Sequence, residues 1–585
     1  MAQRAKWSLQ APQHSTGKRD PGMNREPDTC DYLIIGGGSS GCALASRLSE
    51  DSANRVILVE AGQDVDGASE PEAVRDARFR TLNDPRFLWP NLTAAYTRDG
   101  PSGLPFGQAR ILGGGSSVNG MHAQRGLPAD YDEWAQLGIR GWAWEDVLPF
   151  FKRLETDADF SGEQHGEEGP VHLYRVPRGK WSGLTKSIAS SFERRGIHYI
   201  PDLNGQDGDG YGSVPINSVG ADRISSARAY LPATVRARSN LKIVTGTTAS
   251  QLILSDGHVF GAVFGEGEEA KEIRAHQTVL CCGALHTPAL MLRSGIGPGD
   301  QLTQAGISVR HSLRGVGSNL INHPMLILAA HLKPQGRQQP GVLSPCPAIM
   351  RYSSMFPGVP RTDMVLNVWE RTPNTLSWDP LGRQIANVMV IINKVFSAGQ
   401  VALRSDRTLD VSFNLLGDHR DKERMVESVH LLADLLDQAK SDGVVDAAFF
   451  PAMTPLAALL MQDNWKAQML SVAGAAAFSG PEPIRKRALA VAGTRLDVVM
   501  ADQRKLVETV VQSALPGGHV AGTCRMGHPE HPASVTDSNG RVLGIQGLSV
   551  ADTSIFPTLM AGGTNLPVIM AAEKIAATLR SEARA

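Results

Sequence analysis

The chain is poor in cysteine, has no long apolar run and carries no excess of charge of either sign. Its six cysteines among 585 residues are too few for a disulfide framework, and none are arranged as paired CxxC ligands, so no metal is expected. No stretch of 18 consecutive apolar residues occurs, so no membrane span is expected either. Lys and Arg number 58 and Asp and Glu 59, which gives no general electrostatic attraction to nucleic acid. A small-molecule partner is therefore expected.

The N-terminal residues 1–29 are polar and charged, and they lack the apolar core of a secretory signal. We expect a disordered tail there and, since cysteines are few, a reducing, cytoplasmic compartment. Apolar residues make up 42% of the chain and charged residues 20%, as in ordinary globular proteins. A chain of this length should divide into two domains.

The first motif, "YLIIGGGSSGCALAS", combines an apolar strand, a glycine turn and a helix that opens with small residues. Gly36, Gly38 and Gly41 permit a tight turn and the close approach of a pyrophosphate to backbone N–H groups. Glu60 ends the next apolar strand, where its carboxylate can accept hydrogen bonds from a ribose. The pattern predicts a dinucleotide site, and the acid disfavours NADP, which leaves FAD and NAD.

Four later stretches decide between these cofactors. They are "GQARILGGGSSVNGMHAQRG" (107–126), "CCGALHTPALMLRSGIG" (281–297), "HVAGTCRMG" (519–527) and "AGGTNLPVIMAAEKI" (561–575). In this order, and over nearly the whole chain after residue 30, the sequence resembles the glucose-methanol-choline (GMC) flavin oxidoreductases. The resemblance implies FAD as the cofactor.

The resemblance also implies which residues lie at the FAD. They are Gly36, Gly38, Ser39, Ser40, Gly41, Glu60, Ala61, Trp89, Arg110, Gly114, Ser116, Ser117, Asn119, Gly120, Met121, Ala249, Gly283, Asp552, Thr553, Asn565 and Leu566. In members with covalent FAD a histidine follows the serine pair, whereas Val118 stands here, so we expect non-covalent FAD. The partial positive charge at the start of the last helix is expected to face the flavin edge that becomes negative on reduction.

Oxidation of an alcohol requires a base for the hydroxyl proton, and histidine suits this role because its pKa lies near neutrality. Of the sixteen histidines we choose His519, from its motif and from the resemblance. The resemblance implies a second catalytic histidine or asparagine where this chain has Gly563. Another side chain could enter that space, a water or a substrate group could fill it, or the protein could be slow, altered or non-oxidative. Asn565 also belongs to this region but is a poor substitute, because a shift of two residues at a helix start turns its side chain elsewhere.

The expected fold is α/β (α+β overall), with a Rossmann-like FAD-binding domain in discontinuous segments and a substrate domain built on an antiparallel sheet flanked by helices. The FAD-binding domain is assigned to 30–149, 216–324 and 516–585, and the substrate domain to 150–215 and 325–515. Three local predictions refine this picture: an antiparallel meander from 241–246, 249–254 and 258–265, a floor over the flavin from 387–395 and 401–413, and an amphipathic helix at 421–443.

The leading hypothesis is FAD-dependent oxidation of a primary aryl, furanyl or bulkier alcohol by hydride transfer to flavin N5. Oxygen or another acceptor then takes the electrons, since oxidases and dehydrogenases share these motifs. One alternative is a flavin-containing lyase, similar to hydroxynitrile lyases, in which His519 acts as acid and base without net redox change. Another is an accessory protein that keeps FAD for structure alone. The sequence leaves the oligomeric state open.

Overall fold

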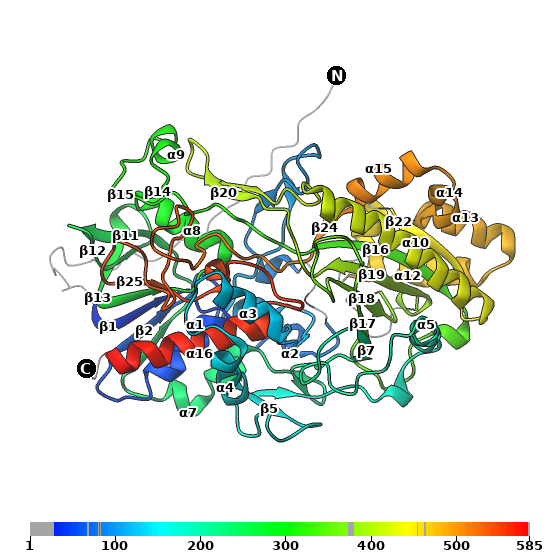
Figure 1. Cartoon of the computed structure of the whole chain (residues 1–585), viewed down its shortest axis with the longest axis horizontal. Coiled ribbons are helices and arrows are strands. Elements are labelled where there is room, and N and C mark those ends of the chain that lie inside the picture. Colours follow the sequence, from blue (N-terminus) through cyan, green and yellow to red (C-terminus); the bar gives the residue numbers. More distant parts are fainter. Residues whose placement is uncertain are drawn as a thin grey trace, which may run out of the picture.

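The computed structural model describes residues 28–66, 70–79, 81, 84–372, 380–452, 454–460 and 464–582. Of the predicted tail at 1–29, residues 1–27 lie outside this set. Two large sheets lie at opposite ends of the molecule, and chain segments cross between them repeatedly (Figure 1). The mixed α/β architecture that the sequence predicts is confirmed.

The first sheet has seven strands in the order β10–β2–β1–β13–β12–β11, with β25 beside β13. Their bounds are β1 Asp28–Ile35, β2 Val56–Val59, β10 Leu241–Val244, β11 Ala249–Ser255, β12 His258–Phe264, β13 Lys271–Leu280 and β25 Leu548–Val550. β1, β2, β10, β13 and β25 pair in parallel, and the centre of β1 is buried on both faces, as its unbroken apolar run requires. Helices α1 (Ser39–Leu48) and α16 (Asn565–Glu582) pack together beside this sheet.

The prediction of a meander from 241–265 is only partly correct. β11, β12 and β13 are antiparallel neighbours, but β10 pairs in parallel with β2 at the other edge of the sheet. A short apolar run does not reveal the direction of its partner, so the sequence could not distinguish these two places.

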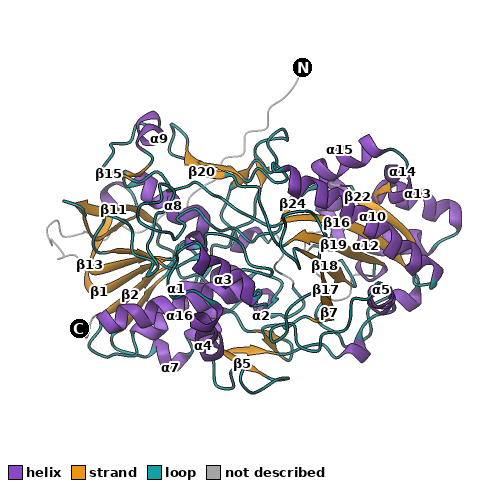
Figure 2. Cartoon of the chain, viewed as in Figure 1, coloured by secondary structure: helices purple, strands orange, loops and turns teal. Residues whose placement is uncertain are grey.

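The second sheet has eight strands, all in antiparallel pairs, in the order β23–β22–β16–β19–β18–β17–β7, with β24 beside β16. Their bounds are β7 Gly210–Ser213, β16 Pro324–Leu332, β17 Ala348–Tyr352, β18 Met364–Trp369, β19 Ile385–Ile392, β22 Val445–Pro451, β23 Gly493–Arg495 and β24 Leu515–Pro516. Figure 2 shows helices gathered around this sheet, among them α5 (Gly183–Arg194) and α10 (His419–Ser441). α10 confirms the helix predicted at 421–443 and packs on β19 and β22.

The floor predicted from 387–395 and 401–413 is half wrong. β19 belongs to the second sheet, but 401–413 forms a separate hairpin of β20 (Gln400–Leu403) and β21 (Leu409–Ser412). Its apolar residues pack in a small cluster with Ala94 and Phe106, far along the chain, which the alternating pattern could not reveal.

Two further findings concern the cysteines, which are few, and the long apolar runs, which the sequence lacks. All six cysteines are free thiols, and five of them are buried. Within the described ranges, no helix combines the length and the apolar character needed to cross a bilayer.

Candidate active site

A cavity of about 3790 Å³ lies between the two sheets and is lined by residues of both. Its wall at the first sheet includes the glycine turn before α1, and its wall at the second includes alternate residues of β16, β18 and β19. The two ends therefore combine a nucleotide-type cradle with a separate chamber for a second molecule.

Two positions of the glycine turn, Gly36 and Gly41, admit no side chain. Gly36 has φ +103°, and a Cβ there would lie 2.4 Å from the carbonyl oxygen of Cys281. A Cβ on Gly41 would lie 1.9 Å from the carbonyl oxygen of Gly36. Gly38 precedes α1 without a side-chain cap, so the first N–H groups of the helix are free to bind an anion at the cavity wall.

Glu60 fixes this turn from the neighbouring strand. Its carboxylate accepts hydrogen bonds from the N–H groups of Gly37 (2.8 Å) and Gly62 (2.7 Å), and burial raises its pKa. Glu60 and Ala61 line the cavity. The acid predicted to hold a ribose thus also organises the backbone around it.

The loop predicted to face the flavin contains the short helix η2 (Gly114–Ser117). A Cβ on Gly114 would lie 2.7 Å from the Cα of Gly38, so the loop passes directly against the glycine turn. The hydroxyls of Ser116 and Ser117 donate to the carbonyls of Gly113 (2.5 Å) and Leu112 (2.8 Å) and are fully buried. These serines shape the loop.

Asp552 joins two elements at the cavity wall. Its carboxylate accepts hydrogen bonds from the N–H of Gly283 (2.8 Å) and the hydroxyl of Thr287 (2.6 Å) on α8 (Gly283–Arg293), and from the N–H of Ser554 (2.8 Å) on η7 (Thr553–Ile555). Burial raises its pKa. Asp552 therefore holds the start of α8 beside the segment that leads to α16.

The predicted cofactor residues converge on this wall, although not all of them line the cavity. Those that do are Gly36, Gly38, Ser39, Ser40, Glu60, Ala61, Trp89, Gly114, Asn119, Gly120, Ala249, Gly283, Asp552, Thr553 and Asn565. The others do not line it: Gly41, Arg110, Ser116, Ser117, Met121 and Leu566. Their contact with the cofactor stays a prediction.

His519 forms a pair with His323, to which the sequence analysis gave no role. The two Nδ1 atoms lie 2.8 Å apart, and Nε2 of His323 lies 3.1 Å from the carbonyl oxygen of Asn393. Burial lowers the pKa of His519 to about 4 and that of His323 well below its usual range, so both rings are neutral. The side-chain oxygen of Asn322 accepts a hydrogen bond from the backbone N–H of His519 (3.0 Å) and holds the residue in place.

The contacts of the pair assign its protons. A carbonyl oxygen can only accept, so the proton of His323 is on Nε2 and its Nδ1 is an acceptor. His519 must then donate from Nδ1, which leaves a lone pair on its Nε2. A Cβ on Gly563 would lie 3.6 Å from this Nε2, and both residues line the cavity. His519 thus presents an unprotonated nitrogen to the cavity.

Asn565 does not reach His519. Its side-chain oxygen accepts a hydrogen bond of 2.7 Å from the hydroxyl of Ser39, which ties the start of α16 to the start of α1. The side chain joins two elements of the nucleotide cradle. This placement agrees with the expectation that Asn565 does not take over from the side chain that Gly563 lacks.

Three histidines at the cavity were missed by the sequence analysis. They are His122, His286 and His323. His122 and His286 lie inside stretches that carry the family resemblance, so their position within a motif was the available signal. His286 stacks on Trp89 with ring centroids 4.2 Å apart.

The residues present fit FAD. The glycine turn and the uncapped start of α1 suit a pyrophosphate, and Glu60 suits a ribose. Buried polar atoms of the cavity-lining Gln108 and His286 have no hydrogen-bonding partner within the described chain and are available to a ligand. Val118, where covalent members have histidine, lines the cavity and has no nucleophilic atom.

Comparison with known proteins identifies the family. The family model described as GMC oxidoreductase matches residues 30–325, and a second model of the same description matches 395–572. The 5-(hydroxymethyl)furfural oxidase of Methylovorus sp. is 34% identical over 570 residues, which cover 94% of this chain and 99% of the relative. An oxygen-dependent choline dehydrogenase of Rhizobium johnstonii is 30% identical over 576 residues, which cover 93% of this chain and 94% of the relative.

A solved structure is similar over nearly the whole chain. Pyridoxine 4-oxidase from Mesorbium loti has a TM-score of 0.74 at 25% identity, with 94% of this chain and 99% of that chain covered. The predicted family, the enzyme class and the cofactor are confirmed. The chain belongs to the GMC oxidoreductase family and is an FAD-dependent oxidoreductase.

Proposed function

We propose that the protein oxidises a primary alcohol with an uncharged aryl, furanyl or bulkier body, and that His519 is the base. The observation that carries this proposal is the histidine pair, which leaves the lone pair of His519 Nε2 at the cavity. Bound FAD supplies the hydride acceptor at its N5. The electrons then pass to oxygen or another acceptor.

His519 takes the hydroxyl proton on Nε2 as the alcohol carbon loses hydride, so the product is an aldehyde. The low pKa of His519 keeps Nε2 unprotonated at neutral pH. His323 accepts from Nδ1 throughout, which fixes the orientation of the ring and supports the imidazolium that forms.

The body of the substrate is proposed to lie along the second sheet. Side chains of one face point to the cavity because they alternate along each strand. They are Met325, Ile327 and Ala329 of β16, Val365, Asn367 and Trp369 of β18, and Ile385, Asn387, Met389 and Ile391 of β19. This face carries no charge and offers two amides, Asn367 and Asn387, as its hydrogen-bonding side chains besides the Trp369 indole.

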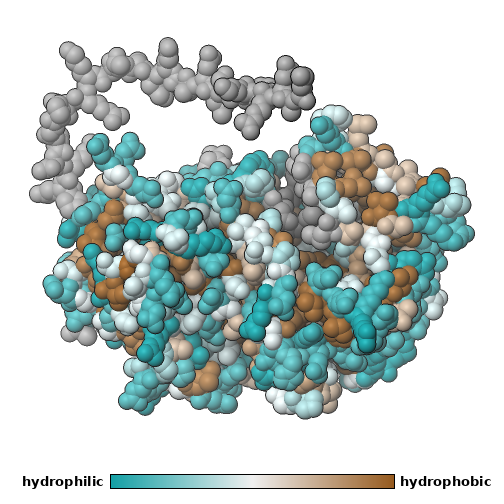
Figure 3. Space-filling view, turned by 90° about the horizontal axis from the view of Figure 1, so that it is seen from above, coloured by the Kyte–Doolittle hydropathy of each residue, from teal (hydrophilic) through white to brown (hydrophobic). Residues whose placement is uncertain are grey.

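Helices α12 (Trp465–Ser479) and α13 (Glu482–Ala492) cover the sheet and add apolar residues such as Phe478 and Ala488. The outer face of α12 is also apolar, with Trp465, Met469 and Val472 exposed, and Figure 3 shows apolar surface at this end of the molecule. An uncharged alcohol suits this chamber better than a cation such as choline, the substrate in the name of one relative.

Anaerobic mixing of the holoenzyme with aryl, furanyl and aliphatic primary alcohols tests the proposal. We expect the visible absorbance of oxidised flavin to bleach with at least one class. A tertiary benzylic alcohol, which has no hydrogen on the reacting carbon, is the control and should bleach nothing. Turnover of a cyanohydrin without bleaching would instead support the lyase alternative. If no alcohol bleached the flavin and no cyanohydrin were turned over, FAD would have a structural role alone.

A further inference from the structure

Gly563 leaves space beside the proposed base. A Cβ at this residue would have two neighbours within 4 Å, Nε2 of His519 at 3.6 Å and the carbonyl oxygen of His122 at 3.9 Å. The gap therefore lies between His519 and the chain at His122. A group that replaces the missing side chain must come from a neighbouring wall.

His122 stands on such a wall and lines the same cavity. The chain reaches it through Met121, whose φ of +62° turns the backbone and whose N–H donates to the side-chain oxygen of Asn119 (3.0 Å). The backbone of His122 pairs with that of Ile216, and its ring lies beside the Trp369 indole with centroids 6.2 Å apart. The residue is thus fixed by backbone pairing and by ring packing.

The ring nitrogens of His122 are free for a ligand. Among the residues that the structure describes, no side chain or carbonyl forms a hydrogen bond or an ion pair with them. Burial and the nearby His519 lower the pKa of His122 to about 4, so the ring is neutral and carries one N–H donor. A neutral donor suits an oxygen that becomes negative as its proton leaves.

We propose that His122 donates the second hydrogen bond to the substrate oxygen and so replaces the side chain that Gly563 lacks. This inference rests on the proposed alcohol oxidation at His519. The proton of the hydroxyl goes to His519 Nε2, and the N–H of His122 stays on its ring and stabilises the developing negative charge. The base and the donor then lie on either side of Gly563.

A binding experiment tests His122 without turnover. The holoenzyme is titrated with 2-phenylpropan-2-ol, which has a hydroxyl but cannot donate hydride, and with cumene, which lacks the hydroxyl. Both Kd values are followed by the change in flavin absorbance. The Kd of cumene divided by the Kd of 2-phenylpropan-2-ol measures recognition of the hydroxyl. We expect His122→Leu to lower this ratio about three- to tenfold, His122→Gln to keep most of it, and His276→Leu, a change at an exposed histidine of β13, to leave it unchanged.

Kinetics provide the second test. With a primary alcohol that reduces the wild-type flavin, His122→Leu should slow reduction about 10²–10³-fold. A Cβ at Gly563 would make only ordinary van der Waals contacts. Gly563→Asn should restore the rate at least about tenfold in the double variant, but change the wild-type rate by less than about threefold. This rescue separates a hydrogen-bonding role from a structural one.

Equal hydroxyl recognition in His122→Leu and in wild type would overturn the assignment, as would flavin reduction within twofold of wild type. If His122→Leu does not retain FAD, His122→Phe and His122→Gln take its place. Equal Kd ratios for these two variants would then overturn the assignment of His122 as the donor. A wild-type flavin that no primary alcohol reduces would contradict the proposed function instead, and the Kd ratio would still decide the role of His122.

Discussion

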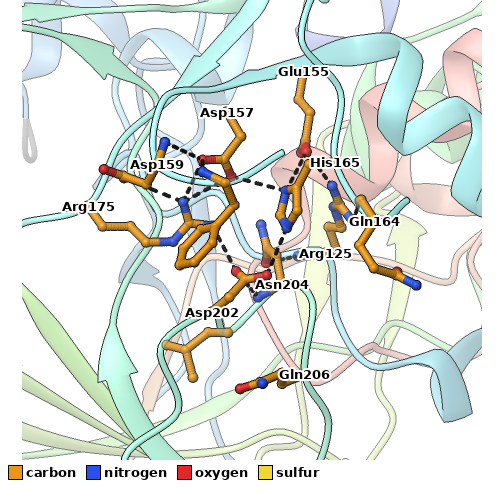
Figure 4. A network of polar contacts seen from close by, with 12 residues as sticks. Arg125, Glu155, Asp157, Asp159, Gln164, His165, Arg175, Asp202, Asn204 and Gln206 are labelled. Atoms are coloured by element: carbon orange, nitrogen blue, oxygen red, sulfur yellow. Dashed lines mark hydrogen bonds and ion pairs between the residues drawn. The ribbon is translucent and has the colours of Figure 1, made fainter. Parts of the chain in front are cut away.

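The cavity histidines and a second group, built around one histidine and its contacts, differ in charge, although both lie inside the protein. The second group, the His165 cluster, lies where α4 (Trp144–Leu154) leads into β5 (Glu155–Asp157) (Figure 4). Its members are Arg125, Glu155, Asp157, His165, Arg175 and Asp202. None of them lines the cavity.

Both nitrogens of His165 face carboxylates. Nδ1 lies 3.1 Å from Glu155 and 3.2 Å from Asp157, and Nε2 lies 2.8 Å from Asp202. Although burial opposes the charge, these carboxylates raise the pKa of His165 to about 10, so the ring is an imidazolium. In the pair of His519 and His323, by contrast, the hydrogen-bonding partners are uncharged. Burial lowers the pKa of both rings and the nearby Lys394 lowers that of His323 further, so both stay neutral.

The arginines complete the charge balance of the cluster. Arg125 pairs with Glu155, and Arg175 bonds to Asp157 (2.8 Å) and Asp202 (2.9 Å). Three positive groups thus face three carboxylates within the cluster, and Arg175 also lies 3.5 Å from the partly exposed Asp159. Glu155, Asp157 and His165 are close enough to ligate a metal ion, but the arginines already neutralise their carboxylates. Burial alone therefore does not set the role of a histidine; its partners decide whether it serves as base or as structural cation.

The largest effect is expected from His519→Gln, which keeps the size of the side chain and removes the base. Flavin reduction by a primary alcohol should slow about 10²–10⁴-fold, while bound FAD and thermal stability are kept. In wild type, kcat/KM should rise as pH rises through about 4, the pKa of His519, and then level off. A variant that retains this rise would show that another group is the base.

The glycine turn, Glu60 and the start of α16 were predictable because short stretches of sequence carry them. His323 was not, because it lies 196 residues from His519 and its role depends on a long-range contact. The same holds for the parallel pairing of β10 and for the separate hairpin of β20 and β21.

The His165 cluster gave no signal in the sequence. Its members are spread from Arg125 to Asp202, and charged residues at irregular spacing are usually solvated. Only the fold, which buries both signs together, gives these side chains their structural role.

The next largest effect is expected from His165→Leu, which leaves buried carboxylates short of one positive charge. The free energy of unfolding should fall by about 3–5 kcal/mol, measured by urea or thermal unfolding of the holoenzyme. Flavin reduction by the folded fraction should stay within twofold of wild type, since the cluster lies outside the cavity. A loss no larger than that of the surface control His276→Leu would contradict an imidazolium at this position.

The smallest effect is the dependence of the free energy of unfolding on pH. The His165 cluster and the cavity histidines should change it in different pH ranges, one alkaline and one acid. The folded pKa of His165, about 10, lies above its usual 6.5, so its contribution is complete below about pH 6.5 and is lost as pH rises through 10. The folded pKa values of His122 and His519, about 4, lie below 6.5, so the unfolded chain binds more protons and stability falls as pH drops from about 6.5 toward 4.

Each group contributes a slope of at most about 1.4 kcal/mol per pH unit. Urea unfolding across pH should therefore show His165→Gln losing part of the alkaline slope and His519→Gln losing part of the acid slope. The crossed result, in which His165→Gln alters only the acid slope, would mean that the carboxylates do not hold a charged ring. The opposite pH ranges follow because the same imidazole gains a proton where carboxylates face it and loses one where burial acts without them.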